Sequence, residues 1–390
     1  MAKDDGMLAE ALGMLESLVA FDTTSRNSNL PLLDMVQGWL ESRGIPCRLL
    51  PTAEAGKANL YAMVGPAIPG GTALSAHVDC VPVEGQAWLA DPFALRRQDG
   101  KLIGRGTSDM KGFAACAITM MPRYAALDLA RPVHLLLTHD EETTANGART
   151  LAPMLAELGP LPAACIVGEP TGMVPVIAHK GYASWDVTIT GLSGHSSRAG
   201  ETANALHAAA EGVAWLAREG RRFAREGRRA EGFDPPFTTV HAGTLNAGTI
   251  LNIVPDRADF TFEVRSVPGD DYRTVLAGFE RHMEAVALAP LLPGGPRCAM
   301  RISPRSVLPA CNLPEDAPLT LLVQRLTGRN SAGRVSYGTE AGLYEGAGVP
   351  SIVCGPGHIA QAHQPEEWIA ESEILACLDL LDRLGGALCA

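Results

Sequence analysis

Short and almost wholly apolar runs recur through the first 170 residues, and segments with helical spacing separate them. The runs "TALSAHV", "VHLLLT" and "ACIVGEP" have the length of strands, whereas "LLDMVQGWLES" repeats its apolar residues at helical spacing. Strands that are apolar on both sides belong to a sheet that helices cover on both faces. The alternation therefore predicts an α/β domain.

The pattern changes after Glu169 and changes back before the end of the chain. From "ASWDVTITG" onward, strands and helices follow in a β-α-β-β-α-β order, which is typical of a ferredoxin-like α+β domain. The α/β pattern resumes with "PLTLLVQRLTG" and "PSIVCGPG". We therefore predict a discontinuous α/β domain of residues 1–180 and 309–390, with an inserted domain at 181–308.

Length, charge and cysteine content narrow the class of protein. A chain of 390 residues exceeds the usual size of a single core, which agrees with two domains. The net charge of -11 disfavours nucleic acid and anionic membranes as partners and favours a small molecule. Nine cysteines without a C-x-x-C pair, an acidic start and no long apolar run indicate a cytoplasmic protein without a signal peptide or membrane span.

Two neighbouring glutamates, Glu141 and Glu142, follow the apolar run "VHLLLT" in the segment "HDEETTANGA". Adjacent side chains on an extended backbone point to opposite sides, so one carboxylate can bind a metal while the other handles a proton. The alternative is that the pair opens a surface helix. The choice depends on whether other ligand-type residues follow other strands.

Four further segments carry such residues at a strand end or a helix start. They are "SAHVDCVP" with His77 and Asp79, "GRGTSDMKG" with Asp109, "VGEPTG" with Glu169, and "AHQPEEW" with His363. Each has an ordinary explanation by itself, such as a packed histidine, a helix cap at Asp109 or a turn at Glu169. Because the carboxyl ends of the strands of an α/β sheet share one edge, their recurrence favours a common site.

Histidines and carboxylates without cysteine form a ligand set that suits Zn²⁺ or a similar divalent ion. Asp109 can bridge two ions about 3.5 to 4 Å apart, with His77 and Glu169 on one and Glu142 and His363 on the other. Asp79, two residues after His77, can accept the second N–H of its ring.

In this order, and with an α+β insert before the last of them, these motifs resemble the di-zinc family of aminoacylases, carboxypeptidases and desuccinylases over nearly the whole chain. The resemblance implies a di-zinc exopeptidase-like catalytic domain and an insert that serves as lid and dimerisation domain. It implies two Zn²⁺ per subunit, with Co²⁺ as a substitute, and a homodimer. It also implies a cis peptide after Asp109.

The same resemblance implies the roles of individual residues. Glu141 is expected to act as general base and acid, and the five metal ligands are expected to be His77, Asp109, Glu142, Glu169 and His363. Asp79 is expected to assist catalysis through His77. His195 in "SGHSS" is expected to stabilise the oxyanion, although such a histidine is otherwise typical of a structural turn.

Three residues are weaker candidates for substrate binding. Arg265 in "EVRSVPG" can pair with a carboxylate through its planar guanidinium group, and its alternative is a solvated strand arginine. Asn252 in "LNIVP" is a comparable candidate, and Glu340 in "YGTEAG" is a candidate partner for a side-chain ammonium group.

The expected reaction is hydrolysis of the N-acyl amide of a small amino acid. Within the family, the segments "AHKGYASWDVTITGLSGHSS" and "YGTEAGLYEGAGVPSIVCGPG" most resemble a deacetylase branch that acts on N2-acetyl-L-ornithine. The desuccinylase branch has a Gly-Gly-Thr-Ser-Asp type of segment where this chain reads "YGTEAG". Alternatives are a succinyl-diaminopimelate desuccinylase, a broader deacylase or dipeptidase, and a catalytically silent binding protein on the same fold.

Overall fold

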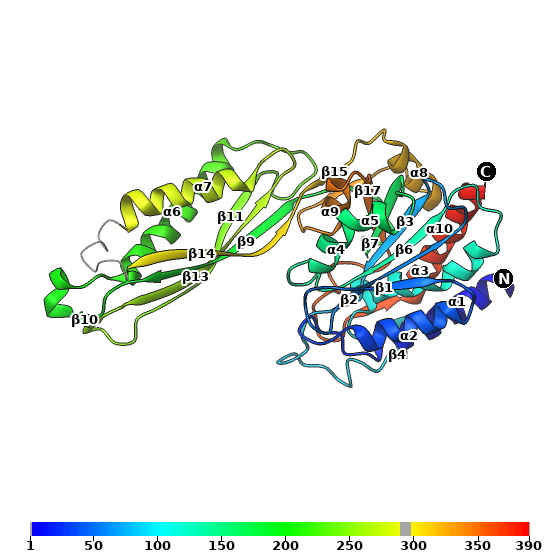
Figure 1. The fold of residues 1–390 in the computed structure, drawn as a ribbon, viewed down its shortest axis with the longest axis horizontal. Helices are drawn as coiled ribbons and strands as arrows, with labels where there is room; N and C mark the ends of the chain where they lie inside the picture. Colours follow the sequence, from blue (N-terminus) through cyan, green and yellow to red (C-terminus); the bar gives the residue numbers. More distant parts are fainter. Residues whose placement is uncertain (1, 289–297, 390) are drawn as a thin grey trace. The chain divides into compact units, whose positions relative to one another are not determined.

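The computed structural model describes residues 2–288 and 298–389, and the chain divides into two compact units (Figure 1). Unit 1 comprises Met1–Ala178, Cys311–Arg334 and Thr339–Ala390, and unit 2 comprises His179–Ala310 and Val335–Gly338. The insert predicted from the sequence, residues 181–308, is two residues shorter at each end than the segment His179–Ala310 of unit 2. The prediction did not assign the segment Val335–Gly338 to the insert. Within the described residues, no helix is both long enough and apolar enough to cross a membrane.

The main sheet of unit 1 has the strand order β1-β2-β6-β3-β7-β17-β8-β15, and β16 pairs with β8. The neighbours β6, β3, β7 and β17 run parallel to one another, while β1 and β2 form an antiparallel margin. The strands are β1 (Cys47–Pro51), β2 (Ala58–Val64), β3 (Thr72–His77), β6 (Val133–Thr138), β7 (Ala164–Pro170), β8 (Val176–His179), β15 (Cys311–Asn312), β16 (Gly333–Val335) and β17 (Ser351–Gly355). A separate small sheet joins β18 (Trp368–Ala370), β5 (Lys101–Ile103) and β4 (Arg96–Gln98).

Helices cover this sheet, as the continuous apolar runs predict. All residues of β3, β6 and β7 are buried, so neither face of these strands meets water. Helix α3 contacts α1, α2 and α10, while α4 and α9 contact each other and the sheet (Figure 1). The helices are α1 (Ala2–Val19), α2 (Leu30–Glu41), α3 (Gly112–Ala125), α4 (Asn146–Leu151), α5 (Leu155–Leu158), α8 (Pro318–Thr327), α9 (Ala341–Gly346) and α10 (Glu371–Cys389).

One predicted helix is broken in the structure. The segment "ARTLAPMLAEL" has helical spacing, but it divides into α4, a 3₁₀ turn at Ala152–Met154, and α5. Pro153 lies in that turn, and proline lacks the N–H group that an α-helix uses. The helix predicted at 202–219 begins at Ala205 and continues to Glu226, and the helix predicted at 272–287 is an α-helix to His282 and a π-helix over Met283–Ala287. The other predicted helices and strands are present with smaller shifts at their ends.

Unit 2 has the β-α-β-β-α-β order of a ferredoxin-like domain. Its sheet has the order β11-β13-β9-β14, and one face packs on α6 and α7 around a second hydrophobic core. Buried and partly exposed residues alternate along β13, as they should in a strand with only one covered face. The elements are β9 (Gly181–Thr190), α6 (Ala205–Glu226), β11 (Thr239–Ala247), β13 (Arg257–Ser266), α7 (Tyr272–His282) and β14 (Ala299–Leu308), with a small sheet of β10 (Gly194–His195) and β12 (Ile253–Val254).

Candidate metal centre

Parallel strands bring ligand-type side chains to one edge of the main sheet. His77 is the last residue of β3, Glu141 and Glu142 follow β6, and Glu169 lies near the end of β7. Because β6, β3 and β7 are adjacent and parallel, their carboxyl ends share an edge. His363 arrives from the segment after β17, the next strand of the sheet.

Asp109 lies in the segment Thr107–Lys111, which leads into α3. Its peptide bond to Met110 is cis, which confirms the conformation that the resemblance implies. One carboxylate oxygen, Oδ1, is 3.1 Å from Nε2 of His77, and the other, Oδ2, is 3.3 Å from Nε2 of His363. The two oxygens of one buried carboxylate therefore face two different histidines.

Glu169 and Glu142 contact different histidines. Oε1 of Glu169 is 3.8 Å from Nε2 of His77, whereas Oε2 of Glu142 is 2.9 Å from Nε2 of His363. Ligand atoms within 4.8 Å of one another occur in three groups among the described residues. Two of them belong to this cluster, His77 with Asp109 and Glu142, and His77 with Glu141 and Glu169, and the third joins Glu54, His139 and Asp140. Glu141 is thus near enough to be a ligand as well as a proton carrier.

Burial makes this cluster of carboxylates hard to ionise without added positive charge. Burial raises the pKa of Glu141 and of Glu169 well above the usual range, and the charge of Asp109 raises both further. Burial and the Asp109 charge also raise the pKa of Glu142 to about 7. Oε1 of Glu169 is buried without a hydrogen-bond partner. These acceptor oxygens and histidine nitrogens fit divalent cations, whose binding displaces protons from such groups.

Asp109 is the exception among these carboxylates. Burial alone would raise its pKa, but hydrogen bonds from His363 and His77 hold the pKa well below its usual value. The same contacts with Asp109 and Glu142 raise the pKa of His363 to about 10. The anionic Asp109 between two histidines has the position that a bridging ligand requires.

Asp79 fixes the backbone of the glutamate pair. The backbone N–H groups of Glu141 and Glu142 donate to Oδ1 and Oδ2 of Asp79, at 3.1 and 3.3 Å, and the Ser25 hydroxyl donates to Oδ2 at 2.7 Å. Nδ1 of His77 is 3.1 Å from the backbone oxygen of Asp79 and 3.5 Å from its Oδ1. Asp79 therefore contacts both His77 and the segment that carries the two glutamates.

Sequence reasoning missed two buried ion pairs beside this cluster. Nζ of Lys57 donates to Oδ1 of Asp140 and to the backbone oxygen of Ser25, both at 2.7 Å. The second pair joins Arg105 to Glu367 at 2.7 Å. Glu367 belongs to another pair of adjacent glutamates, in "AHQPEEW". This pair repeats the Glu141–Glu142 pattern, and the repetition could have identified Glu367 as a candidate residue.

Three residues that the sequence analysis assigned to catalysis or substrate binding lie in unit 2. His195 is exposed on β10, and its Nδ1 accepts a hydrogen bond from the Ser197 backbone N–H at 3.2 Å. The backbone oxygen of Asn252 accepts from the N–H of Ser196 at 3.0 Å, so the His195 and Asn252 segments are neighbours. Arg265 on β13 stacks over the ring of Tyr182 and pairs with Glu263 at 2.9 Å.

Glu340 precedes α9 and is completely buried. Its Oε1 accepts a hydrogen bond from Thr138 at 2.7 Å, and its Oε2 accepts one from Ser75 at 3.3 Å. Burial raises its pKa to about 7. Its role as partner of a substrate ammonium group stays a prediction, and this burial does not favour it.

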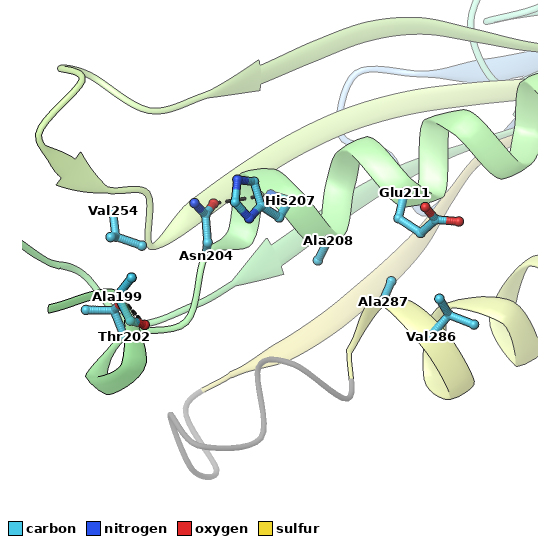
Figure 2. A pocket seen from close by; sticks show the side chains of 9 residues that line it. All are labelled: Ala199, Thr202, Asn204, His207, Ala208, Glu211, Val254, Val286 and Ala287. Carbon is cyan, nitrogen blue, oxygen red and sulfur yellow. Dashed lines mark hydrogen bonds between the residues drawn. The ribbon is translucent and has the colours of Figure 1, made fainter. Parts of the chain in front are cut away.

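A hollow in unit 2 lies beside the segment that follows His195 (Figure 2). Its lining includes Ala199 and Thr202 from that segment and Asn204, which accepts the backbone N–H of His207 and caps α6. None of the predicted metal ligands lines this hollow.

Residues 73–385 match the sequence model of Peptidase family M20/M25/M40. This span contains every candidate residue of the site. The chain belongs to that family. Solved structures agree with the fold of an M20 family member: the M20 family metallo-carboxypeptidase Sso-CP2 of Sulfolobus solfataricus has a TM-score of 0.76 at 16% identity, covering 96% of this chain and 98% of its own. The YXEP protein of Bacillus subtilis, a dinuclear metal binding peptidase from the M20 family, has a TM-score of 0.66 at 16% identity and covers 98% and 99%.

Relatives named acetylornithine deacetylase are more similar in sequence than these solved structures. The acetylornithine deacetylase of Myxococcus xanthus is 36% identical over 384 residues, covering 96% of each chain. The acetylornithine deacetylase of Photorhabdus laumondii subsp. laumondii is 35% identical over 359 residues, covering 92% of this chain and 90% of its own. The acetylornithine deacetylase of Pasteurella multocida is 33% identical over 390 residues, covering 97% and 98%.

Proposed function

We propose that this protein is a metal-dependent amidohydrolase that removes the acetyl group from N2-acetyl-L-ornithine and releases L-ornithine and acetate. The relatives named acetylornithine deacetylase, similar over nearly the whole chain, support the substrate. Formation of ornithine would place the reaction in arginine biosynthesis. The observation that carries the chemistry is the unequal environment of Glu141 and Glu142.

Glu142 is committed to His363, at 2.9 Å, whereas no hydrogen bond or ion pair engages the Glu141 carboxyl group among the described residues. An unpaired carboxyl group beside the ligand cluster is free to exchange a proton. We infer that Glu141 takes a proton from the attacking water and later delivers it to the departing amine nitrogen. The water oxygen would form the new bond to the acyl carbon as the amide C–N bond breaks.

Two metal ions would be held by the five proposed ligands, with Asp109 shared between the ions, His77 and Glu169 on one side and Glu142 and His363 on the other. When bound, such ions acidify a water molecule and polarise an acyl carbonyl group. We propose Zn²⁺ as the native ion and Co²⁺ as a substitute, because the donors are imidazole and carboxylate groups.

His195 is proposed to donate a hydrogen bond to the oxygen on which negative charge develops. Because its Nδ1 accepts the Ser197 N–H, the neutral ring carries its proton on Nε2, which is then available as a donor. Arg265 is proposed to pair with the substrate carboxylate, and Asn252, next to the His195 segment, to contact the substrate. The predicted insert, residues 181–308, which forms most of unit 2, would then serve as lid and dimerisation domain.

A panel of substrates tests the proposed specificity. The purified protein is loaded with Zn²⁺ or Co²⁺ and given N2-acetyl-L-ornithine, N-succinyl-L,L-diaminopimelate, N-acetyl-L-methionine and a dipeptide. We expect the highest kcat/KM for N2-acetyl-L-ornithine. Faster hydrolysis of the succinyl compound would identify a desuccinylase, and binding of two ions without hydrolysis of any compound would support a silent binding protein.

We further propose a cytoplasmic homodimer in which His195 acts on the partner subunit's site. The nine cysteines, which form no disulfide within the described part of the chain, support a reducing compartment. Mixing inactive His195→Ala and Glu141→Gln proteins should restore activity, because a heterodimer then has one site with both residues. If subunits exchange and activity does not return, His195 acts within its own subunit or not at all.

A further inference from the structure

Glu367 is a buried carboxylate with an unusual set of partners. Its Oε2 accepts hydrogen bonds from the guanidinium group of Arg105 at 2.7 Å and from the backbone N–H of Gly106 at 3.1 Å. Its Oε1 accepts the backbone N–H groups of Ser108 and Asp109, at 2.9 and 3.1 Å. Four donors therefore satisfy both oxygens, which leaves this carboxylate no free position for a metal ion.

Three of these donors belong to the backbone that leads into Asp109. Gly106 has a positive φ of 82°, so the chain turns sharply just before the segment that carries Asp109. The turn directs the Gly106, Ser108 and Asp109 N–H groups towards a single carboxylate. The Glu367 side chain thus contacts three backbone N–H groups of the segment that carries Asp109.

Glu367 also belongs to the segment that supplies His363, four residues earlier. Its own backbone oxygen accepts the N–H of Gly104 at 2.9 Å, which ties the two segments together a second time. Arg105 strengthens the link, because it is fully buried and also donates to the backbone oxygen of Gln364 at 3.3 Å. One carboxylate therefore joins the segments of Asp109 and His363.

We propose that Glu367 is a positioning residue of the metal centre, which holds the Gly106–Asp109 backbone so that the two Asp109 oxygens face His77 and His363 at the same time. This inference rests on the proposed function, because it requires Asp109 to be a shared ligand. Carboxylates that orient metal ligands affect metal affinity by about 10- to 100-fold when they are removed.

Glu366 provides a matched control in the adjacent position. Its Oε2 pairs with Arg96 at 2.6 Å and its Oε1 accepts the Leu89 N–H at 2.9 Å. These contacts lie outside the Asp109 segment. Glu366→Gln and Glu367→Gln therefore make the same chemical change one residue apart.

The test is a titration of Co²⁺ into metal-free protein. Binding is measured by calorimetry, as the heat of binding, and by the visible absorption spectrum of the bound ion. In Glu367→Gln an amide N–H₂ group replaces one of the two carboxylate oxygens. Each oxygen of Glu367 accepts hydrogen bonds from N–H donors, so the N–H₂ group, which cannot accept them, faces donors in either orientation of the amide. We expect the folded variant to bind at least one ion about 10- to 100-fold more weakly and to show an altered visible spectrum. Glu366→Gln should bind like the unmodified protein, and Glu367→Asp, which keeps the charge but shortens the side chain, should recover part of the affinity.

Two results would overturn the inference. One is a folded Glu367→Gln protein with unchanged affinity for both ions and an unchanged spectrum. The other is failure of both Glu367 variants to fold at a temperature where the metal-free protein is folded, because Glu367 would then be a folding residue. Asp109→Asn distinguishes failure of the positioning role of Glu367 from failure of the proposed metal site. If Asp109→Asn also keeps both ions, the proposed metal site itself is wrong.

Discussion

Glu141 and Glu142 are neighbours in sequence but have different surroundings. Asp79 holds the backbone N–H groups of both residues, and the two side chains then diverge. Glu142 meets His363, whereas the Glu141 carboxyl group has no such partner among the described residues. Asp79 therefore fixes the backbone of both glutamates, and the different surroundings of their side chains allow them to have different roles.

The two corresponding variants should fail in different ways. Glu141→Gln keeps the shape of the side chain but cannot carry a proton, so we expect turnover to fall roughly 10²- to 10⁴-fold with metal content retained. Glu142→Gln should lose metal affinity first. Metal analysis and steady-state kinetics on both proteins measure this, and the reverse pattern would mean that the two roles are assigned backwards.

Glu340 should make the stability of the metal-free protein depend on pH. Burial raises its pKa from 4.5 to about 7, so between these values the folded protein keeps a proton that the unfolded chain releases. Rising pH therefore favours unfolding across this range, by up to about 3 kcal/mol for this group. Glu340→Gln stays neutral, so its stability relative to the unmodified protein should increase from pH 4.5 to pH 7.5.

Urea unfolding at several pH values measures this difference. Glu16→Gln, a change at an exposed glutamate on α1, is the control for the substitution itself. A constant difference between Glu340→Gln and the unmodified protein across the range would show that Glu340 is ionised in the folded protein.

At the scale of secondary structure, close packing of β7 against α3 positions Glu169. Gly168 precedes Glu169, and a methyl group at Gly168 would lie 1.9 Å from Cγ of Phe113, which is buried in α3. Only glycine lets the strand and the helix approach this closely. The end of β7, and the carboxylate it carries, therefore depend on a residue without a side chain.

Gly168→Ala should force β7 away from α3. We expect a loss of stability of about 1 to 3 kcal/mol or more, together with weaker metal binding, because Glu169 moves with the strand. Gly386→Ala is the control: Gly386 is exposed in α10 with nothing within 4 Å of the added carbon, so this change should stabilise the helix by up to about 1 kcal/mol. Denaturant unfolding and metal titration compare the two, and equal stabilities would contradict the packing argument.

At the scale of the whole molecule, the candidate metal ligands all belong to unit 1, which has its own hydrophobic core. Unit 2 has a separate core and none of the proposed ligands. Metal ions bound to unit 1 stabilise it by mass action, and this stabilisation is lost when they leave. Metal removal should therefore affect the two units differently.

Chelation should loosen unit 1 selectively. At an ion concentration 100 times the dissociation constant, bound metal contributes about 2.7 kcal/mol to stability. We expect a chelator to speed hydrogen exchange at the ends of β3 and β7 and in the segment Thr107–Lys111, with β9 and β13 unchanged. The same chelator saturated with Zn²⁺ is the control, and equal effects on both units would contradict a site confined to unit 1.

The sequence by itself determined the α/β pattern, most helices and strands, and the ligand-type residues of the proposed site. Apolar periodicity is a local property, and the rule that parallel strands share a carboxyl edge converts it into a spatial prediction. That is why His77, Glu169 and the Glu141–Glu142 pair could be expected to meet although they are far apart in the chain. The break at Pro153 shows the limit of periodicity when a single residue lacks a backbone donor.

Only the tertiary structure decided which buried partners complete the site. Glu367 meets Gly106 across 261 residues of sequence, Lys57 meets Asp140 across 83, and Glu340 meets Thr138 across 202. No local pattern specifies such pairs, because each depends on how two segments pack after the chain has folded. A buried charge is stable only when its partners are in place, so the folded structure selects these contacts and the sequence pattern does not.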